Sequence, residues 1–416
     1  MPTEGRLNLK KGLNVLIVNA HWHNRGDESA VRAMIDSLRE KLPIAKMTIM
    51  LNVADFPYDD IEFLPYYPNN RREYLDSVPA LLFNGKSYNS SGKRFVQAVR
   101  EADVVIHAPG GAALGEIYQY GLLEYSYLYR LLFSKLIARK PVFIYAPSMG
   151  PFRNRLRNVL RKFVLKRADV IMLREGESAR YLKEQLKIDS IVTADSALQN
   201  DIPADYLKRY TDVEPVLEAI EKNKTVGITI TDLKWHPIYK KQASVTDRIE
   251  KALSESIARI IDKGYNVVLI PQIFGEPTDF SLLEKFRSIN RDRILILPGN
   301  IDSYGQQVII SKMHSFIGMR YHSNIFAAKG KVPFVSIYYE HKMKGFMSLL
   351  GLAEMSLDVE SIDSDKIIER FEYLEKNYAE IRNTLEKHVP ELQRESRRTS
   401  DIIVDWLSSH GDRKII

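Results

Sequence analysis

The sequence predicts an α/β protein with two Rossmann-like domains, and three observations support this. Short runs of β-branched residues alternate with amphipathic helical stretches, which is typical of parallel strands joined by crossover helices. The alternation restarts after about residue 200. A chain of 416 residues is also longer than one hydrophobic core usually supports. A last amphipathic helix near the C-terminus is expected to close back on this architecture.

The strands are expected at short, uniformly apolar runs, and the helices at stretches of helical periodicity. In the first half the predicted strands are Asn14–Asn19, Met47–Leu51, Asp103–His107, Val142–Ala146, Val170–Leu173 and Ile191–Ala194. In the second half they are Thr225–Thr229, Asn266–Pro271, Ile294–Leu297, Ser315–Gly318 and Phe334–Ile337. Helical periodicity between them is clearest at Ser29–Leu42, Phe152–Arg167 and Ser244–Lys263.

A break near Gln199–Pro215, with Asp-Ile-Pro and Val-Glu-Pro, indicates the linker between the domains. We predict an N-terminal domain over 1–205, a C-terminal domain over 206–385 and a helical segment over 386–416. Two Rossmann-like domains facing across a cleft resemble the GT-B architecture, in which ligands bind near the C-terminal ends of the strands. The last segment has four apolar residues at helical spacing: Ile402, Ile403, Trp406 and Leu407.

Composition excludes some functional classes. With no cysteine, the chain has no disulfides and no thiolate metal site. The net charge of +7 suits a partner that carries phosphate or carboxylate, but no Lys/Arg tract predicts nucleic-acid binding. No run approaches the roughly 20 apolar residues of a membrane span, and no cleavable leader is visible, so we expect a cytoplasmic protein.

Loops after the predicted strands carry the candidate site residues, because strand C-termini share the ligand-binding edge of such sheets. The first loop holds His21, His23 and Asp27, and either Asp27 or Ser29 could cap the following helix. Two histidines without a carboxylate partner are too few to indicate a metal site, and no metal is predicted. The other loop candidates are Asn24, Gly26, Gly110, Gly111, Ser148, Gly150 and Gln272.

The segment Gly318–His322 is the most informative, because it places Arg320 at a strand end and His322 in the first turn of a helix. A helix N-terminus favours anions, and the planar guanidinium of arginine suits carboxylate and phosphate. Imidazole can exchange protons near neutral pH. We therefore predict that Arg320 holds an anion and that His322 is its acid/base or phosphate ligand. Arg174, also at a strand end, could hold an anion or form a salt bridge with Glu177 or another local acid.

Residues 152–167 form an amphipathic helical pattern with Arg and Lys, and no acidic residue, on its polar side. One interpretation is a helix packed on the sheet with a solvated basic face. The other is peripheral contact with anionic lipids at the inner face of the membrane. The apolar stripe consists of Leu156, Val159, Leu160, Phe163 and Val164.

In their order along the chain these motifs resemble the polysaccharide pyruvyl transferases, most of all the branch with the colanic acid pyruvyl transferases. The resemblance spans residues 14 to 355. It implies transfer of the enolpyruvyl unit of phosphoenolpyruvate to a sugar of an exopolysaccharide or lipid-linked repeat unit, forming a pyruvate ketal and releasing phosphate. The motifs that carry it are Asn24–Asp27, Gly110–Gly111, Ser148–Pro151, Leu173–Ser178, Gly318–His322, Tyr339–Gly345 and Leu349–Leu352.

The resemblance also implies roles for particular residues. Arg320 and His322 match the motif associated with the donor, and Tyr321 stands where leucine is common in the family. Arg174 matches a family position in the first half, and Lys342 is a further donor contact. The N-terminal domain would take the acceptor and the C-terminal domain phosphoenolpyruvate, which is a co-substrate and not a cofactor.

The base that activates the acceptor hydroxyl is left open among carboxylates. Asp27 is our choice, with Glu28 and Glu116 as alternatives. Two other functions also stay open at this point. A GT-B glycosyltransferase with a nucleotide-sugar donor would use similar anion-binding loops, and a carbohydrate-binding protein without activity would keep the fold alone.

Overall fold

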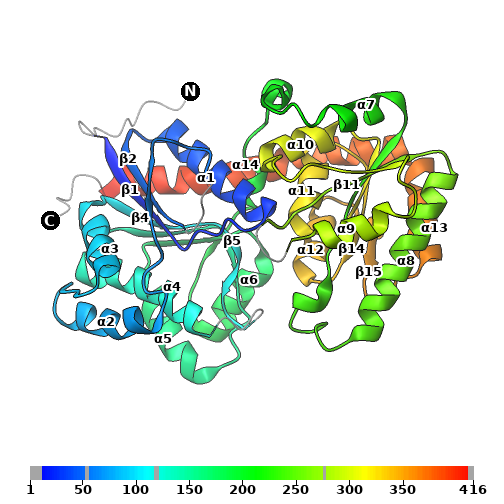
Figure 1. Ribbon diagram of the computed structural model, residues 1–416. Coiled ribbons are helices and arrows are strands. Elements are labelled where there is room, and N and C mark those ends of the chain that lie inside the picture. Colours follow the sequence, from blue (N-terminus) through cyan, green and yellow to red (C-terminus); the bar gives the residue numbers. More distant parts are fainter. Residues whose placement is uncertain (1–11, 52–55, 117–120, 275–277, 411–416) are drawn as a thin grey trace. The chain divides into compact units, whose positions relative to one another are not determined.

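The computed structural model describes residues 12–51, 56–116, 121–274 and 278–410. These residues fall into two compact units. Unit 1 comprises the chain up to Trp22, residues 30–199 and the chain from Arg394 onward; unit 2 comprises residues 23–29 and 200–393. Each unit is a parallel sheet covered by helices (Figure 1).

Unit 1 has a seven-stranded sheet of order β3-β2-β1-β4-β6-β8-β9, with every neighbouring pair parallel. Its strands are β1 (Leu13–Val18), β2 (Ile44–Met50), β3 (Ile61–Leu64), β4 (Val104–His107), β6 (Val142–Tyr145), β8 (Val170–Leu173) and β9 (Ile191–Val192). The central strands β4 and β6 are buried along their whole length, as expected for parallel strands covered on both faces. The strand order reverses between β1 and β4, which is the topological switch point of this sheet.

Two groups of helices cover the two faces of this sheet (Figure 1). Val15 and Ile17 pack with α1 and the last part of α14, whereas Leu16 and Val18 pack with α2 to α5 on the opposite face. The helices are α1 (Arg25–Lys41), α2 (Arg71–Leu82), α3 (Ser90–Glu101), α4 (Leu122–Leu132) with the π-turn η1 (Phe133–Ile137), α5 (Arg155–Leu165), and α6 (Gly176–Tyr181) with η2 (Leu182–Leu186). The 3₁₀ turn η3 (Ser196–Leu198) lies just before the chain passes into unit 2.

Unit 2 has a six-stranded sheet of order β12-β11-β10-β13-β14-β15, again parallel throughout. Its strands are β10 (Thr225–Thr229), β11 (Asn266–Leu269), β12 (Ile294–Ile296), β13 (Ser315–Gly318), β14 (Phe334–Tyr338) and β15 (Ser356–Asp358). Taken in chain order this is the 3-2-1-4-5-6 arrangement of a Rossmann fold, and its switch point lies between β10 and β13.

The helices of unit 2 pack in pairs, α8 against α13 and α10 against α11 (Figure 1). They are α7 (Glu214–Lys222), α8 (Ala243–Asp262), α9 (Phe280–Arg287), α10 (Ser303–Ser311), α11 (Tyr321–Lys329), α12 (His341–Leu349), α13 (Ser364–Lys376) and the first part of α14 (Tyr378–His410). Three 3₁₀ turns complete the unit: η4 (Ala204–Arg209), η5 (Leu233–Trp235) and η6 (Ala353–Met355). No helix in the described ranges is long and apolar enough to cross a bilayer.

The predicted fold class, two Rossmann-like α/β domains, is confirmed, but some local predictions differ from the structure. Gly110–Gly111 and Ser148–Met149 were expected in turns, yet they lie in a small parallel sheet of β5 (Gly110–Leu114) and β7 (Pro147–Met149). Glycine and proline made these strands look like turns. The sequence also did not reveal β3 and β15, because both are short edge strands with partly exposed residues.

The last part of α14 belongs to unit 1, where Ile403 is fully buried against the sheet. Substituting Ile403→Ala should lower the free energy of unfolding by about 2–4 kcal/mol, because it leaves a cavity in a close-packed core. Asp405→Ala, at an exposed position of the same helix, should change it little. Urea unfolding of both variants measures the difference. Equal stability of the two would show that this helix contributes nothing to the core.

Candidate functional site

Five chain segments of unit 2 carry the candidate site. Four of them follow β10, β11, β13 and β14 at the C-terminal edge of the sheet, and the fifth is the segment 23–29, which includes the first turn of α1. The segments after β10 and β13 flank the switch point, which is where open α/β sheets bind their ligands.

Arg320 is the N-cap residue of α11, immediately after β13, and its backbone is extended there. One of its terminal nitrogens donates to Oδ1 of Asp279 over 3.0 Å. The other oxygen of Asp279 accepts from the backbone N–H groups of Gln272 and Ile273. The loop after β11 therefore holds Asp279 rigidly, and Asp279 orients the guanidinium. Nε of Arg320 is buried and makes no hydrogen bond within the described part of the chain.

His322 lies against the backbone of Gly26. A Cβ atom built on Gly26 would be only 2.0 Å from Nδ1 of His322, so no other residue fits there without moving the imidazole. Gly26 is in the first turn of α1, and His322 is in the first turn of α11. Backbone N–H groups in a first helical turn lack intrahelical acceptors, and both helix dipoles favour anions there. Two helix N-termini thus meet at this imidazole.

The first turn of α1 is capped by Asn24, not by Asp27 or Ser29 as the sequence suggested. Oδ1 of Asn24 accepts from the backbone N–H of Asp27 over 2.8 Å, and Nδ2 of Asn24 donates to the Asp27 carboxylate over 2.7 Å. The hydroxyl of Ser29 instead accepts from Gln307 over 2.9 Å. This places Asn24 and Asp27 in a reciprocal cap that fixes where α1 begins.

Arg25 ties this turn to the rest of unit 2. Its backbone N–H donates to the Gln272 carbonyl over 2.9 Å, and its guanidinium donates to the Gly299 carbonyl and lies 3.5 Å from the ring centre of Phe274. It also pairs with Glu28. Gln272 is therefore a framework residue between Arg25 and Asp279, and its own side chain donates to Gln306.

Glu28 has a structural role. The carboxylate is 2% exposed and accepts hydrogen bonds from both the backbone and the hydroxyl of Ser303 in α10. Glu116, in unit 1, forms an ion pair with the buried Arg161 over 2.6 Å and accepts from the backbone of Arg153. Both carboxylates therefore already form structural hydrogen bonds and ion pairs, whereas a general base needs a carboxylate that can take a proton from the substrate.

The loop after β14 adds Lys342 and aromatic side chains. Nζ of Lys342 is 2.6 Å from Glu340 and 5.6 Å from the ring centre of Tyr321. Tyr321 itself is buried and packs edge-on against His322, with ring centres 5.2 Å apart. Tyr321 thus supports the imidazole by packing. Burial raises the pKa of Tyr339 to about 12, so this phenol beside Arg320 is neutral at physiological pH.

Sequence reasoning missed two side chains of this cluster. Asp279 is not among the residues that the sequence singled out, and the signal that could have found it is an acid at the end of a strand-to-helix loop. Trp235, after β10, lies 5.9 Å from the Arg320 guanidinium and 6.1 Å from Tyr339, measured to ring centres. An aromatic residue shortly after a central strand was the available signal.

Arg174 and the glycine loops belong to unit 1. Arg174 is buried and pairs with Asp195 over 2.6 Å, and its Nε donates to Ser148 over 2.8 Å. Its acidic partner is therefore Asp195 and not Glu177. Gly150 has a φ of 84° and packs against Tyr181, so it serves a tight turn in the framework. Arg174, Ser148 and Gly150 are thus tied into the framework of unit 1.

His21 and His23 also belong to different units. His21 is 2.7 Å from the hydroxyl of Tyr127, whereas His23 is exposed. Within the described residues no group of three or more His, Asp or Glu side chains is arranged to hold a metal ion. The prediction that no metal is required stays a prediction.

A cluster of buried polar residues, which the sequence did not reveal, lies near the switch point of unit 1. Arg130 is fully buried and donates to Asn19 over 2.9 Å and to the Tyr67 carbonyl over 2.8 Å. His107, at the end of β4, is also buried, and this burial lowers its pKa to about 4, so it is neutral at pH 7. In the sequence Arg130 was visible only as a charge that interrupts an apolar run.

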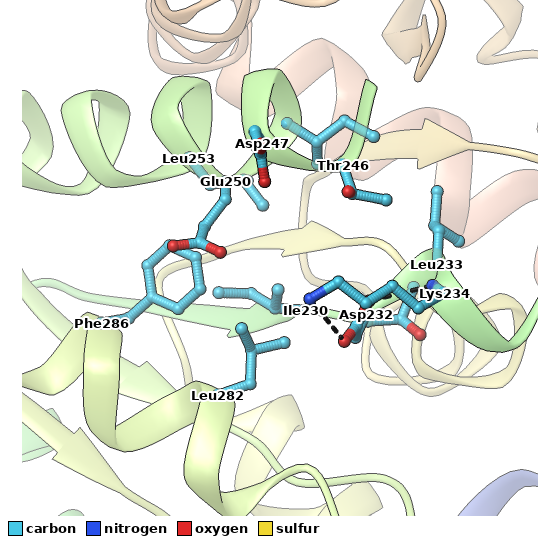
Figure 2. A pocket seen from close by; sticks show the side chains of 12 residues that line it. Ile230, Asp232, Leu233, Lys234, Thr246, Asp247, Glu250, Leu253, Leu282 and Phe286 are labelled. Atoms are coloured by element: carbon cyan, nitrogen blue, oxygen red, sulfur yellow. Dashed lines mark hydrogen bonds and ion pairs between the residues drawn. The ribbon is translucent and has the colours of Figure 1, made fainter. Parts of the chain in front are cut away.

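Figure 2 shows a pocket of unit 2 between α8, α9 and the loop after β10. Its floor is apolar and includes Ile230, Leu282 and Phe286. Asp232, Asp247 and Glu250 place carboxylates around it, and among the described residues that line it the one cation is Lys234, 3.5 Å from Asp232. This lining disfavours an anionic ligand. The pocket is therefore distinct in character from the Arg320–His322 cluster.

A pair of helix N-termini with an oriented arginine at the switch point of a Rossmann-like sheet is typical of enzymes that bind phosphorylated substrates. The family model of polysaccharide pyruvyl transferases matches residues 24–341. The chain belongs to the polysaccharide pyruvyl transferase family. The amylovoran biosynthesis protein AmsJ of Erwinia amylovora is 25% identical over 437 aligned residues, which cover 96% of this chain and 100% of AmsJ.

Solved structures support the fold alone. A putative UDP-N-acetylglucosamine 2-epimerase from Listeria monocytogenes has a TM-score of 0.61 at 13% identity, covering 97% of this chain and 98% of its own. HepE from Anabaena, in complex with UDP-glucose, has a TM-score of 0.58 at 12% identity, covering 95% of this chain and 100% of its own. Both likenesses agree with two Rossmann-like units.

Substituting Gly26→Ala should displace the His322 imidazole, since the new methyl group would overlap it. We expect kcat/KM for transferase activity to fall on the order of a hundredfold, because small misplacements of reacting groups have effects of that size. Gly345→Ala, within α12 and with open space around the new methyl group, is the matched control and should keep its activity. Thermal unfolding shows whether each variant is folded. A fully active Gly26→Ala protein would exclude a role for this contact.

Proposed function

We propose that this protein transfers the enolpyruvyl group of phosphoenolpyruvate to a sugar of an exopolysaccharide or lipid-linked repeat unit, forming a pyruvate ketal and releasing phosphate. Family membership supports pyruvyl transfer, and the relative in amylovoran biosynthesis supports an exopolysaccharide acceptor. The observation that carries the donor assignment is the meeting of Arg320, His322 and two helix N-termini at one switch point.

Phosphoenolpyruvate has a carboxylate and a phosphate, and unit 2 offers complementary groups for both. Arg320, held by Asp279, presents a planar guanidinium that suits either anion. The first turn of α11 offers backbone N–H groups for the second anion, and the dipole of α1, whose Arg25 and Asp27 N–H groups already donate to Gln272 and Asn24, adds positive potential there. Lys342 adds a cation, although Glu340 offsets part of its charge. The carboxylate-rich pocket of Figure 2 does not suit this donor.

The reaction requires proton transfers but no oxidation. A proton added to C3 of phosphoenolpyruvate makes C2 electrophilic, and a sugar hydroxyl forms a bond to C2 and loses its proton. The bond from C2 to the phosphate oxygen then breaks, and phosphate leaves. A second hydroxyl of the same sugar closes the ketal, and its proton goes to phosphate. We assign the proton transfer to C3, or the hydrogen bond to the leaving phosphate, to His322. Because a C–O bond is broken, we expect no obligatory metal.

Acceptor activation is assigned to Asp27. Asp27 follows Gly26, the residue that lies against His322, whereas Glu28 accepts hydrogen bonds from Ser303 and Glu116 pairs with Arg161. We assign acceptor recognition to unit 1, in which His21, after β1, lies 2.7 Å from the hydroxyl of Tyr127 of α4. Since phosphoenolpyruvate is a cytoplasmic metabolite, we place the reaction in the cytoplasm.

Substituting Arg320→Ala or His322→Ala should reduce phosphate release from phosphoenolpyruvate plus acceptor by a factor of about 10²–10⁴, the usual contribution of a positioned acid/base or anion-binding group. Arg382→Ala and His388→Ala, in the α14 part of unit 2, are the matched controls. A panel of nitrophenyl glycosides, with phosphate and ketal product measured together, serves as the assay. Near wild-type turnover by either site variant would refute the assignment.

The same assay separates this function from that of a nucleotide-sugar glycosyltransferase. Phosphate should appear only when phosphoenolpyruvate and an acceptor are both present, and UDP-sugars should give no product. A product that depends on a UDP-sugar would favour the glycosyltransferase. Calorimetry that detects glycan binding but no binding of phosphoenolpyruvate would favour a carbohydrate-binding protein without activity.

A further inference from the structure

The side of helix α5 that faces the core is not the side that its apolar periodicity predicts. Four of its apolar side chains are exposed to solvent: Leu156 by 86%, Val159 by 71%, Phe163 by 43% and Leu160 by 38%. The buried side instead contains a charged residue, Arg161, together with Val164 and Leu165. The interpretation in which the whole apolar stripe packs on the sheet is therefore wrong for these four residues.

Arg161 explains this orientation. Its guanidinium is fully buried and forms ion pairs with Glu124 of α4 over 2.7 Å and with Glu116 over 2.6 Å. Despite burial, hydrogen bonds to these carboxylates hold the pKa of Arg161 above its usual value. Removing one partner of such a buried network is strongly unfavourable. The network therefore fixes α5 with four of the five stripe residues, all but Val164, pointing away from the core.

The neighbouring helices of the same layer also carry exposed apolar side chains. Helix α4 packs against α2 through hydrogen bonds from Tyr74 and Ser77, and against α5 through Glu124. All three helices cover one face of the unit 1 sheet (Figure 1). The exposed apolar side chains of α2 are Leu75, Val78 and Leu82, and Phe83 follows directly after this helix. Helix α4 adds Leu122 at its first position. Together with the stripe of α5, we name this surface the basic apolar face.

Its exposed charges are all positive. Helix α5 has no acidic residue, and the acids of α2 and α4 are turned inward. Glu73 and Glu124 are buried, and the Asp76 carboxylate accepts hydrogen bonds from Tyr67, Ser87 and the backbone of Tyr88. The cations in and next to α2 and α5 are Arg71, Arg72, Lys86, Arg153, Arg155, Arg157, Lys162, Lys166 and Arg167.

We infer that the basic apolar face binds the surface of an anionic lipid bilayer. Exposed leucine and phenylalanine side chains can enter the interfacial region, while flanking arginines and lysines attract acidic headgroups. A second copy of the chain fits less well, because a symmetric contact would bring these like charges together. Such binding would keep the enzyme at the membrane, where a lipid-linked sugar is presented. It is independent of the chemistry of pyruvyl transfer.

Vesicle sedimentation of the full-length protein tests this inference without any substrate. The two vesicle types are phosphatidylcholine alone and phosphatidylcholine with about one third phosphatidylglycerol. We expect binding to the anionic vesicles only, and a decrease as salt rises. The double substitution Leu156→Ser with Phe163→Ser should weaken this binding at least about tenfold, because it removes two apolar side chains that would insert into the bilayer. Both side chains are solvent-exposed, so the fold should be preserved. Arg155→Gln with Arg157→Gln should weaken it on the order of tenfold as well.

Leu349→Ser, which removes an equally apolar and 56% exposed side chain of unit 2, is the matched control and should bind as the wild type does. Light scattering reports the oligomeric state of each variant. Equal binding to both vesicle types, no binding, or no effect of the substitutions in α5 would overturn the inference. So would a dimer that dissociates on Leu156→Ser with Phe163→Ser, since the face would then serve a second copy. None of these outcomes bears on turnover with a soluble glycoside, so failure here leaves the proposed function standing.

Discussion

The close approach of the His322 imidazole to the Gly26 backbone is the constraint around which unit 2 is organised. Because Gly26 has no Cβ, the first turn of α1 can lie directly against the first turn of α11. The surrounding contacts keep this approach in place. Asn24 caps α1, and Arg25 fixes its backbone to the loop after β11. A site that concentrates two helix N-termini needs such a framework, because the partial positive charges repel one another until an anion binds.

The same loop after β11 also orients the arginine. Asp279 accepts two backbone hydrogen bonds with one oxygen and the Arg320 guanidinium with the other. Preorganised groups of this kind stabilise charge without a reorganisation cost during reaction. The site thus depends on residues from separate strand-end loops, and the Rossmann strand order is what brings those loops to one edge.

Unit 1 shows how a buried charge can determine a surface. Arg161 is drawn inward by Glu116 and Glu124, and this ion-pair network leaves the hydrophobic stripe of α5 exposed. Apolar periodicity alone predicts the opposite orientation, because it assumes that the apolar side of a helix faces the core. The same reasoning applies to Arg174, whose burial against Asp195 makes it part of the framework of unit 1.

The sequence by itself determined the parallel α/β class, most central strands and the position of Arg320 and His322 at a strand end and helix start, because these follow from local periodicity and turn residues. It also indicated the family through the order of its motifs. Only the tertiary structure decided that Gly26 meets His322, that Asp279 orients Arg320, and that α5 turns its apolar stripe outward. These contacts join residues far apart in the chain, and local sequence patterns carry no information about such pairings.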